Sequence, residues 1–367
     1  MKPLIVLATD SQEPSGLGEH MITLGEALTD RFAVVLAGPD GPSGMDFLGR
    51  AARRGLRIKA VDLDRLDLFT RWLASVGVAL VHVHAGIGWE GHDLVRHGKA
   101  AGLPVVRTEH LPYLLTSTVQ QAAYRAMLTS VDARIAVSQA VFDTHAGQGG
   151  GRQVVVRNGI AHRPAGSSSA ETRAGLGLLA DDTVLLTVAR LTPQKGHDVL
   201  IAAAPAVLQH NPKAKFVLVG SGPEQANIEA AIAGLGLADK FVLPGHRDDI
   251  ADLMAIADVF VLPSHFEGLP LALLEAMAAS VPVVATTIGG TVEAIGIAHP
   301  FLVPPGDPGA LAAAILQATA EPETARAATS AAASRHAEQF TAARMADQTA
   351  AVYAPWLPNH STQGLSS

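Results

Sequence analysis

The feature that most constrains the fold is a regular alternation of short apolar, β-branched runs with longer stretches of helical periodicity. Such an alternation is typical of parallel sheets covered by helices. In the first half of the chain the predicted strands are Leu4–Ala8, Ala33–Ala37, Arg57–Ala60, Ala79–Val83, Val105–Thr108, Arg134–Val137 and Gln153–Val156. In the second half they are Val184–Val188, Phe216–Val219, Phe241–Leu243, Val259–Leu262, Val283–Ala285 and Phe301–Val303.

The length of the chain favours two domains. It has 367 residues, of which 48% are hydrophobic and 17% charged, enough for two separate cores. The stretch Ala161-His-Arg-Pro-Ala-Gly-Ser-Ser-Ser-Ala has small residues and no periodicity, and is interpreted as the linker. We therefore predict an α/β fold of two doubly wound domains, 1–163 and 164–336, facing each other across a ligand cleft at the carboxyl ends of the strands.

Composition excludes several classes of function. The formal net charge of −7 gives no reason to expect a nucleic-acid partner. The absence of cysteine excludes disulfides, thiol catalysis and cysteine-based zinc sites. The start, MKPLIVLATD, is interpreted as a first strand rather than a secretory signal, and no apolar stretch approaches the length of a membrane span. A cytoplasmic location is the expectation.

The most informative segment is Leu262-Pro-Ser-His-Phe-Glu-Gly-Leu-Pro-Leu-Ala-Leu-Leu-Glu-Ala-Met. We expect a strand to end near Leu262, a loop to carry Glu267 and Gly268, and Pro270 to occupy the first helical position. The helix that follows is apolar nearly all round, so Glu275 is expected to be a lone buried carboxylate that needs a hydrogen-bonding partner. Hydroxyl groups of a ligand would serve, and free backbone N–H groups around 268–272 suit a diphosphate.

The spacing of Glu267 and Glu275 bears on their role. In one continuous helix eight residues span about 12 Å, too far for the carboxylate pair of a glycosidase. We interpret the two carboxylates as hydroxyl clamps on either side of the phosphates. The alternative is that Glu275 pairs with an arginine of the chain and that Glu267 is an ordinary surface residue.

Glu267-x7-Glu275 after a strand resembles the signature of the retaining glycosyltransferases of the GT-B fold, in particular glycosyltransferase family 4 (GT4). Further segments that resemble motifs of this family are Thr187-Val-Ala-Arg-Leu-Thr-Pro-Gln-Lys-Gly-His-Asp, Val219-Gly-Ser-Gly-Pro-Glu, Pro244-Gly-His-Arg-Asp-Asp-Ile and Gly289-Gly-Thr-Val-Glu in the second half. In the first half they are Ser15-Gly-Leu-Gly-Glu-His, Val83-His-Ala, Thr108-Glu-His and Arg157-Asn-Gly-Ile. The resemblance covers about residues 3 to 340.

The resemblance implies that the second domain binds a nucleotide-sugar donor, UDP- or GDP-linked. Arg190 and Lys195 are implied to hold its diphosphate and to stabilise charge on the departing nucleotide. Glu275 is implied to bind the ribose hydroxyls, and Glu267 the hydroxyls of the transferred sugar. The remaining implied donor-binding positions are backbone groups of Gly268, Leu269 and Leu271, with others near Arg247 beside the base.

The first domain is implied to bind the acceptor, which is a lipid, a saccharide or a small metabolite. His110 is implied to lie beside the reacting sugar, and Gly16 to let the first loop approach the phosphates. The implied reaction is a front-face displacement with retention that needs no metal and no cofactor beyond the donor. The end of the chain, about 337–357, is implied to cross back onto the first domain.

Two positions depart from the pattern of the family, and both lie in the acceptor half. Ser15 stands where the first of two glycines is usual, and Glu19 stands where a basic residue is common. The donor half keeps its pattern. Two alternative functions stay open: a nucleotide-sugar epimerase or hydrolase of the same fold, and a non-catalytic sugar-binding protein.

Weaker motifs have plainer explanations. Asp62-Leu-Asp64 has the spacing of a metal–diphosphate contact but is interpreted as a solvated helix start. His82 and His84 share one strand face, as a zinc pair would, but no third ligand follows at a recognisable spacing, so no metal is predicted. The more plausible role of His84 is to line the cleft.

Two further segments are ambiguous. Gly16-x-Gly18 hints at a dinucleotide site, but Met21 occupies the third glycine position, so the match fails. A basic segment is interpreted as a solvated helix face, with peripheral contact to an anionic inner membrane face as the alternative. Its residues are Phe47, Leu48, Arg50, Arg53, Arg54 and Arg57.

Overall fold

The computed structural model describes residues 2–12, 16–161 and 163–357. Ser15 of the first loop and His162 of the predicted linker lie outside the described residues. The chain forms two compact units, one built from the residues up to Gly159 together with those from Gln339 onward, the other from Ile160–Glu338. No helix of the described part is long and apolar enough to cross a membrane.

The first unit contains a seven-stranded parallel sheet in the order β3-β2-β1-β4-β5-β6-β7. Each strand overlaps a run predicted from the sequence, although β4 is longer at both ends. The strands are β1 (Leu4–Ala8), β2 (Ala33–Pro39), β3 (Arg57–Val61), β4 (Val78–Ala85), β5 (Val105–Glu109), β6 (Ala133–Ala136) and β7 (Arg152–Val155).

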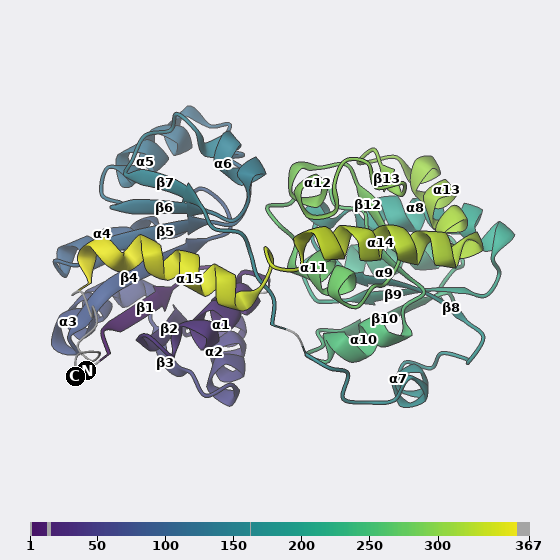
Figure 1. Ribbon diagram of the computed structural model, residues 1–367, viewed down its shortest axis with the longest axis horizontal. Coiled ribbons are helices and arrows are strands. Elements are labelled where there is room, and N and C mark those ends of the chain that lie inside the picture. Colours follow the sequence, from purple (N-terminus) through teal and green to yellow (C-terminus); the bar gives the residue numbers. More distant parts are fainter. Residues whose placement is uncertain (1, 13–15, 162, 358–367) are drawn as a thin grey trace, which may run out of the picture. The chain divides into compact units, whose positions relative to one another are not determined.

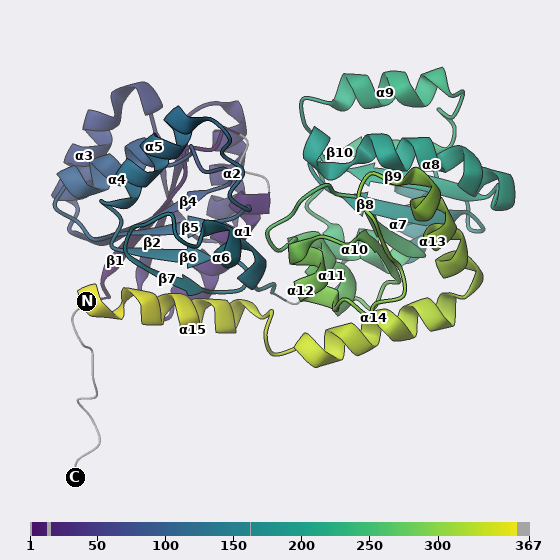
Figure 2. The same ribbon diagram turned by 90° about the horizontal axis from the view of Figure 1, so that it is seen from above.

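Helices cover both faces of this sheet, as Figure 2 shows. On one face, α1 (Gly16–Leu28), α2 (Pro42–Arg53) and α15 (Ala342–Tyr353) bury apolar residues in a common core. On the other, α3 (Leu66–Ser75), α4 (His92–Ala100) and α5 (Thr118–Leu128) form a second core. The shorter elements are η1 (Leu63–Arg65), α6 (Gln139–His145) and η3 (Ala354–Trp356).

The C-terminal helix α15 therefore belongs to the first unit, although it is distant in sequence (Figure 1). Its Tyr353 is fully buried, and its Met345 and Ala346 join the core under α1. Glycine is required at 159, because a Cβ there would lie 2.2 Å from the carbonyl oxygen of Thr341.

The second unit contains a six-stranded parallel sheet in the order β10-β9-β8-β11-β12-β13. Its strands are β8 (Thr183–Val188), β9 (Ala214–Val219), β10 (Phe241–Gly245), β11 (Val259–Leu262), β12 (Val283–Thr286) and β13 (Leu302–Val303). The helices are α7 (Ser169–Gly175), η2 (Pro193–Lys195), α8 (His197–His210), α9 (Gln225–Gly234), α10 (Ile250–Ile256), α11 (Leu271–Ala278), α12 (Gly289–Ile295), α13 (Pro308–Ala320) and α14 (Pro322–His336).

Both sheets reverse their strand order at one point. In the first unit this point lies between β1 and β4, and in the second between β8 and β11. In a parallel sheet, the loops that leave two such strands diverge, and ligands bind beyond the carboxyl ends of the strands there. The predicted donor-binding segments are the loops that follow β8 and β11.

Candidate functional site

The loops after β8 and β11 pack directly against each other. Gly196, with φ of +65°, ends the first loop so close to the second that a Cβ would lie 2.1 Å from the carbonyl oxygen of Pro263. Gln194 joins the loops twice: its carbonyl oxygen accepts from the backbone N–H of His265 at 2.8 Å, and its side chain donates to the carbonyl oxygen of Phe266 at 2.9 Å. The two predicted segments therefore form one local structure.

An ion pair between Lys195 and Glu267 lies in this structure. The Lys195 Nζ is 2.5 Å from Glu267 Oε1, and the side chains are 16% and 4% exposed. Ser264 Oγ donates to the same carboxylate oxygen at 2.8 Å. A charge-assisted hydrogen bond between side chains this deeply buried is strong, and it fixes both of them where the strand order reverses between β8 and β11.

His197 ties the start of α8 to the segment that carries Arg190. Its Nε2 donates to the carbonyl oxygen of Arg190 at 2.9 Å, and its ring is 3% exposed. Burial, aided by the positive charge of Lys195, lowers the pKa of His197 below its ordinary value. The ring is therefore neutral at pH 7, and it leaves Arg190 and Lys195 as the cations of this loop.

Two glycines after β9 hold the Arg190 segment from the other side. A Cβ at Gly220 would lie 1.9 Å from the carbonyl oxygen of Ala189, and one at Gly222 would lie 2.3 Å from that of Leu191. Only glycine allows the backbones to come so close. The segment that resembles the Gly-rich turn of the family thus positions the loop that carries Arg190.

The start of α11 supplies backbone N–H groups next to Glu267. The helix begins at Leu271, and Pro270 is its N-cap with ψ of 120°, so the proline precedes the first helical position rather than filling it. Gly268 packs under α12, where a Cβ at Gly290 would lie 2.2 Å from the Gly268 carbonyl oxygen. Gly268 and Leu269 are buried, and Leu271 is half-buried.

Glu275 is less buried than the sequence suggests. The helix α11 is not covered all round, because Ala278 is exposed and Leu271, Ala272 and Glu275 are half-buried. Its fully buried side is formed by Leu273, Leu274, Ala276 and Met277. An apolar composition overstated the burial, since alanine is found on exposed helix faces as well as in cores.

Arg247 lies in the loop after β10 and is held by its own neighbour. Its Nε donates to Asp249 Oδ1 at 2.8 Å and its terminal nitrogen to Oδ2 at 2.5 Å. This two-pronged contact raises the pKa of Arg247 and lowers that of Asp249. The charged guanidinium is thereby paired within its own loop, so the predicted base-side contacts would depend on the backbone of the loop.

In the first unit, His110 follows β5 directly. Its backbone N–H donates to the carbonyl oxygen of Ala85 at 3.0 Å, and its Nε2 lies 3.1 Å from Nδ1 of His84. His20 of α1 approaches the His110 ring edge-on, with 4.6 Å between centroids. Gly16 is the exposed first residue of α1, and nothing lies within 4 Å of where its Cβ would be.

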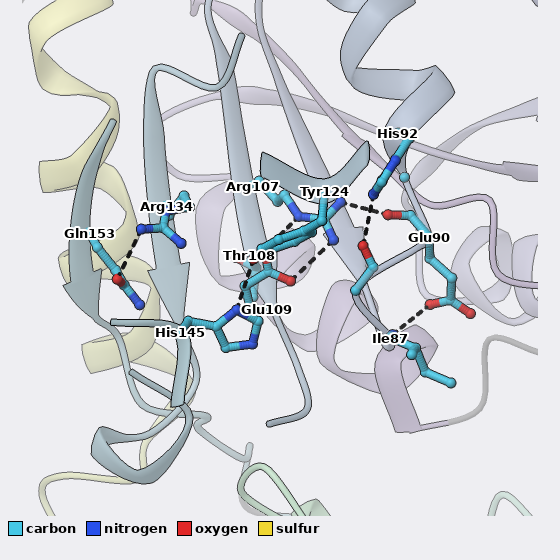
Figure 3. A network of polar contacts seen from close by, with 12 residues as sticks. Ile87, Glu90, His92, Arg107, Thr108, Glu109, Tyr124, Arg134, His145 and Gln153 are labelled. Atoms are coloured by element: carbon cyan, nitrogen blue, oxygen red, sulfur yellow. Dashed lines mark hydrogen bonds and ion pairs between the residues drawn. The ribbon is translucent and has the colours of Figure 1, made fainter. Parts of the chain in front are cut away.

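Sequence reasoning missed a buried polar network beside His110 (Figure 3). Arg107, which is 0% exposed, donates to both carboxylate oxygens of Glu109 at 2.6 and 3.1 Å. Tyr124 donates its hydroxyl to Glu109, and His145 contacts that hydroxyl and the carbonyl oxygen of Leu111. The residues on both sides of His110 are thus held in place. The alternation of Arg107 and Glu109 on one strand face was the available signal.

The aspartates Asp62 and Asp64 lie at the start of the short helix η1. Both are exposed, and the Asp62 side chain accepts from the backbone N–H of Asp64 at 2.9 Å as the N-cap of η1. The predicted solvated helix start is confirmed.

The basic segment around α2 is solvated only in part, because Arg53 and Arg57 are exposed while Arg50 and Arg54 pair with acidic side chains. Arg50 is 6% exposed and pairs with Glu19 and Asp46, while Arg54 pairs with Glu19 and Glu26. Phe47 and Leu48 are fully buried. The interpretation as a solvated helix face is wrong for Arg50. Its guanidinium is buried because it forms an ion pair with Glu19 of the neighbouring helix α1. The membrane alternative loses the apolar residues that it requires.

Family models match both units of the chain. "Glycosyltransferase Family 4" matches residues 14–163, and "Glycosyl transferases group 1" matches residues 168–335. The D-inositol 3-phosphate glycosyltransferase of Streptomyces avermitilis is 35% identical over 225 residues, which are 57% of this chain and 48% of the relative. The phosphatidylinositol N-acetylglucosaminyltransferase gpi3 subunit of Schizosaccharomyces pombe is 23% identical over 77% of this chain and 65% of the relative.

Four curated relatives, these two among them, are matched over only 32% to 65% of their own length. Solved structures match almost the whole chain. Anabaena Alr3699/HepE in complex with UDP and glucose has a TM-score of 0.81 at 22% identity and covers 96% of this chain and 100% of that one. The sucrose-phosphate synthase of Thermosynechococcus elongatus has a TM-score of 0.77 at 23% identity, with 96% and 99% covered.

These likenesses confirm the predicted fold class, a GT-B architecture of two Rossmann-like sheets. Since one model matches 14–163 and the other 168–335, the chain belongs to glycosyltransferase family 4.

Proposed function

We propose that the protein is a retaining glycosyltransferase that moves a sugar from a UDP- or GDP-linked donor to a hydroxyl acceptor. The observation that carries the proposal is the meeting of Lys195 and Glu267 at the switch point between β8 and β11, beside the Arg190 loop and the start of α11. A cation, a carboxylate and the backbone N–H groups of a helix start in one place suit a phosphate next to a sugar hydroxyl.

In this proposal Arg190 and Lys195 bind the donor diphosphate, together with backbone groups of Gly268, Leu269 and Leu271. Glu275 binds the ribose hydroxyls, and the backbone near Arg247 lies beside the base. The diphosphate competes with Glu267 for Lys195, which frees the carboxylate to accept a hydroxyl of the transferred sugar. The ion pair of the donor-free protein thus holds both groups ready.

In the transfer step, the bond between the anomeric carbon and the diphosphate oxygen breaks while the acceptor oxygen attacks from the same face. The departing nucleotide gains negative charge, which Arg190, Lys195 and the helix start meet without a metal. A donor phosphate oxygen takes the acceptor proton. His110 lies beside the reacting sugar, and Gly16 gives the first loop close access to the phosphates.

Relatives suggest which acceptors to try. Their names include D-inositol 3-phosphate and phosphatidylinositol glycosyltransferases and a GDP-mannose-dependent enzyme, so the inositol ring is shared while the donor differs. Free inositol phosphates and phosphatidylinositol vesicles therefore belong in the acceptor pool. A cytoplasmic location stays a prediction, and the burial of Phe47 and Leu48 in α2 gives no support to membrane contact.

The test is a thermal-shift screen of UDP, GDP, ADP and their sugars, followed by labelled donor with and without acceptors. A binding nucleotide raises the melting temperature by mass action, and labelled sugar should appear in product only when an acceptor is present. Conversion of the donor without any acceptor would instead identify an epimerase or hydrolase. Binding of free sugar with no response to any nucleotide would identify a sugar-binding protein.

A further inference from the structure

Three histidines of the first unit bring one ring nitrogen each to a common point. They are His20 of α1, His84 at the end of β4 and His110 after β5, and these nitrogens all lie within 4.8 Å of one another. The elements that carry them are separated in sequence, so no spacing of ligands along the chain reveals the group. The sequence showed His84 no further ligand at a recognisable spacing, and the fold supplies two, His20 and His110.

The rings have free nitrogen atoms where water does not reach. His20 is 3% exposed and His84 is 0% exposed. Nδ1 of His20 has no hydrogen-bond partner among the residues that the structure describes, and Nδ1 of His84 faces another ring nitrogen, Nε2 of His110, at 3.1 Å. A buried polar atom without a partner is destabilising, and each such atom calls for an explanation.

Burial also keeps these rings uncharged. It lowers the pKa of His20 to about 4 and the pKa values of His84 and His110 well below the ordinary value. At pH 7 each ring is neutral and carries a nitrogen lone pair, the form in which imidazole binds metals. His110 is half-buried and is the most exposed of the three residues.

The neighbouring His82 is not a fourth ligand, because both of its nitrogens are engaged. Its Nδ1 lies 2.6 Å from the hydroxyl of Tyr353, and its Nε2 lies 2.6 Å from that of Thr108. The two histidines of β4 therefore differ: His82 anchors α15, and His84 contributes one ring nitrogen to the group. A hydrogen bond to the side chain of Asn158 orients His20 in the way that outer partners orient metal ligands.

The distances suit a tetrahedral metal. Two nitrogens that bind one zinc ion at about 2.0–2.1 Å lie about 3.3 Å apart. Nδ1 of His84 and Nε2 of His110 are 3.1 Å apart, and the three ligand nitrogens, that of His20 included, all lie within 4.8 Å of one another. Three imidazoles with an open fourth position form a known type of zinc site.

We propose that His20, His84 and His110 bind a borderline divalent transition metal, with Zn²⁺ as the representative ion, and that its binding inhibits the enzyme. The inhibition rests on the proposed function, because the metal would occupy the ring of His110 that lies beside the reacting sugar. The ion plays no part in the transfer step. A three-imidazole site selects Zn²⁺ and its neighbours over Mg²⁺, which prefers oxygen ligands.

The test uses the full chain stripped with EDTA, to which Zn²⁺ is added in equilibrium dialysis. We expect one tightly bound ion per chain. His84→Phe and His20→Phe, which keep an aromatic ring of similar volume, should each bind zinc at least tenfold more weakly. His210→Gln is the control, because His210 is exposed at the end of α8. Co²⁺ in the unsubstituted protein should give the intense visible bands of tetrahedral coordination, a readout that needs no variant.

Weak octahedral Co²⁺ bands, no uptake at micromolar Zn²⁺, or undiminished uptake by a folded His84→Phe or His20→Phe variant would overturn the site. Loss of zinc in His210→Gln would do the same. Once a transfer assay exists, zinc should inhibit the protein and EDTA should restore it. Zinc that binds at the three histidines without inhibition would refute the role of His110 while the metal site stands.

Discussion

A double-mutant cycle at Lys195 and Glu267 can separate what this ion pair contributes to the stability of the protein from what it contributes to turnover. In Lys195→Met the Glu267 carboxylate, which is 4% exposed, loses its cation and keeps the hydrogen bond from the Ser264 hydroxyl. Removal of one member of a buried pair destabilises by about 3–5 kcal/mol. The 16% exposure of Lys195 lets some water reach the carboxylate, so we expect about 3 kcal/mol at pH 7.

The double variant Lys195→Met/Glu267→Gln has no unpaired charge. It should regain most of the lost free energy of unfolding, which gives a coupling of about 2 kcal/mol between the two positions. It should nevertheless be inactive, because the cation that meets the departing diphosphate is gone. Stability returns in the double variant while turnover does not, and this contrast separates the structural role of the pair from its chemical role.

The assay is urea unfolding of the four proteins of the cycle, with turnover measured in parallel. Lys213→Met is the matched control, since Lys213 and Asp181 form a pair of 2.7 Å whose side chains are 63% and 64% exposed. Exposed pairs contribute little, so this control should be indistinguishable from the unsubstituted protein. A coupling near zero between Lys195 and Glu267, or a Lys195→Met variant as stable as the control, would refute the reasoning.

Three further predictions follow from single positions in the second unit. Glu275→Ala should weaken nucleotide binding by about 1.5–3 kcal/mol, the range for a lost charged hydrogen bond, and calorimetry with undiminished UDP and GDP affinity would contradict its assignment to the ribose. Gly196→Ala should destabilise the protein more than Gly236→Ala: both glycines have φ near +65 to +69°, but only at 196 would the Cβ meet a backbone oxygen, at 2.1 Å, and equal unfolding energies would refute the close approach. The pKa of His197 is lowered in the folded protein, so the unfolded chain takes up the proton first and the free energy of unfolding should fall as the pH drops below about 6.5. His197→Gln should reduce this dependence between pH 7.5 and 5.5, and an unchanged pH profile would contradict the prediction.

The sheets were predictable because their signal is local. A buried parallel strand is a short run of apolar, β-branched residues, and every predicted run overlaps a strand. Boundaries were less predictable: β4 extends to Ala85 because the buried polar residues His82 and His84 continue the strand. Their burial depends on partners such as Tyr353, which lies 271 positions away in the sequence from His82.

The candidate site was predictable only in part, for the same reason. The residue types around Lys195 and Glu267 were found, but their direct ion pair was not, since nothing in either segment specifies how two loops meet. The Arg50 segment was misread because its acidic partners, Glu19 and Glu26, lie on another helix. Pairings between distant segments decide whether a charge is solvated, and one sequence does not contain them.

The central claim is that the chain transfers a sugar from a nucleotide donor with fixed cations in place of a metal. It is tested most directly by incubating metal-stripped protein in excess EDTA with UDP- and GDP-sugars and the acceptor pool, and by following both nucleotide release and the anomeric configuration of the product. The account predicts undiminished transfer, a product with the donor's configuration, and loss of turnover by orders of magnitude in Lys195→Met that magnesium does not restore. An inverted product, or activity that disappears in EDTA and returns with magnesium or manganese, would contradict it.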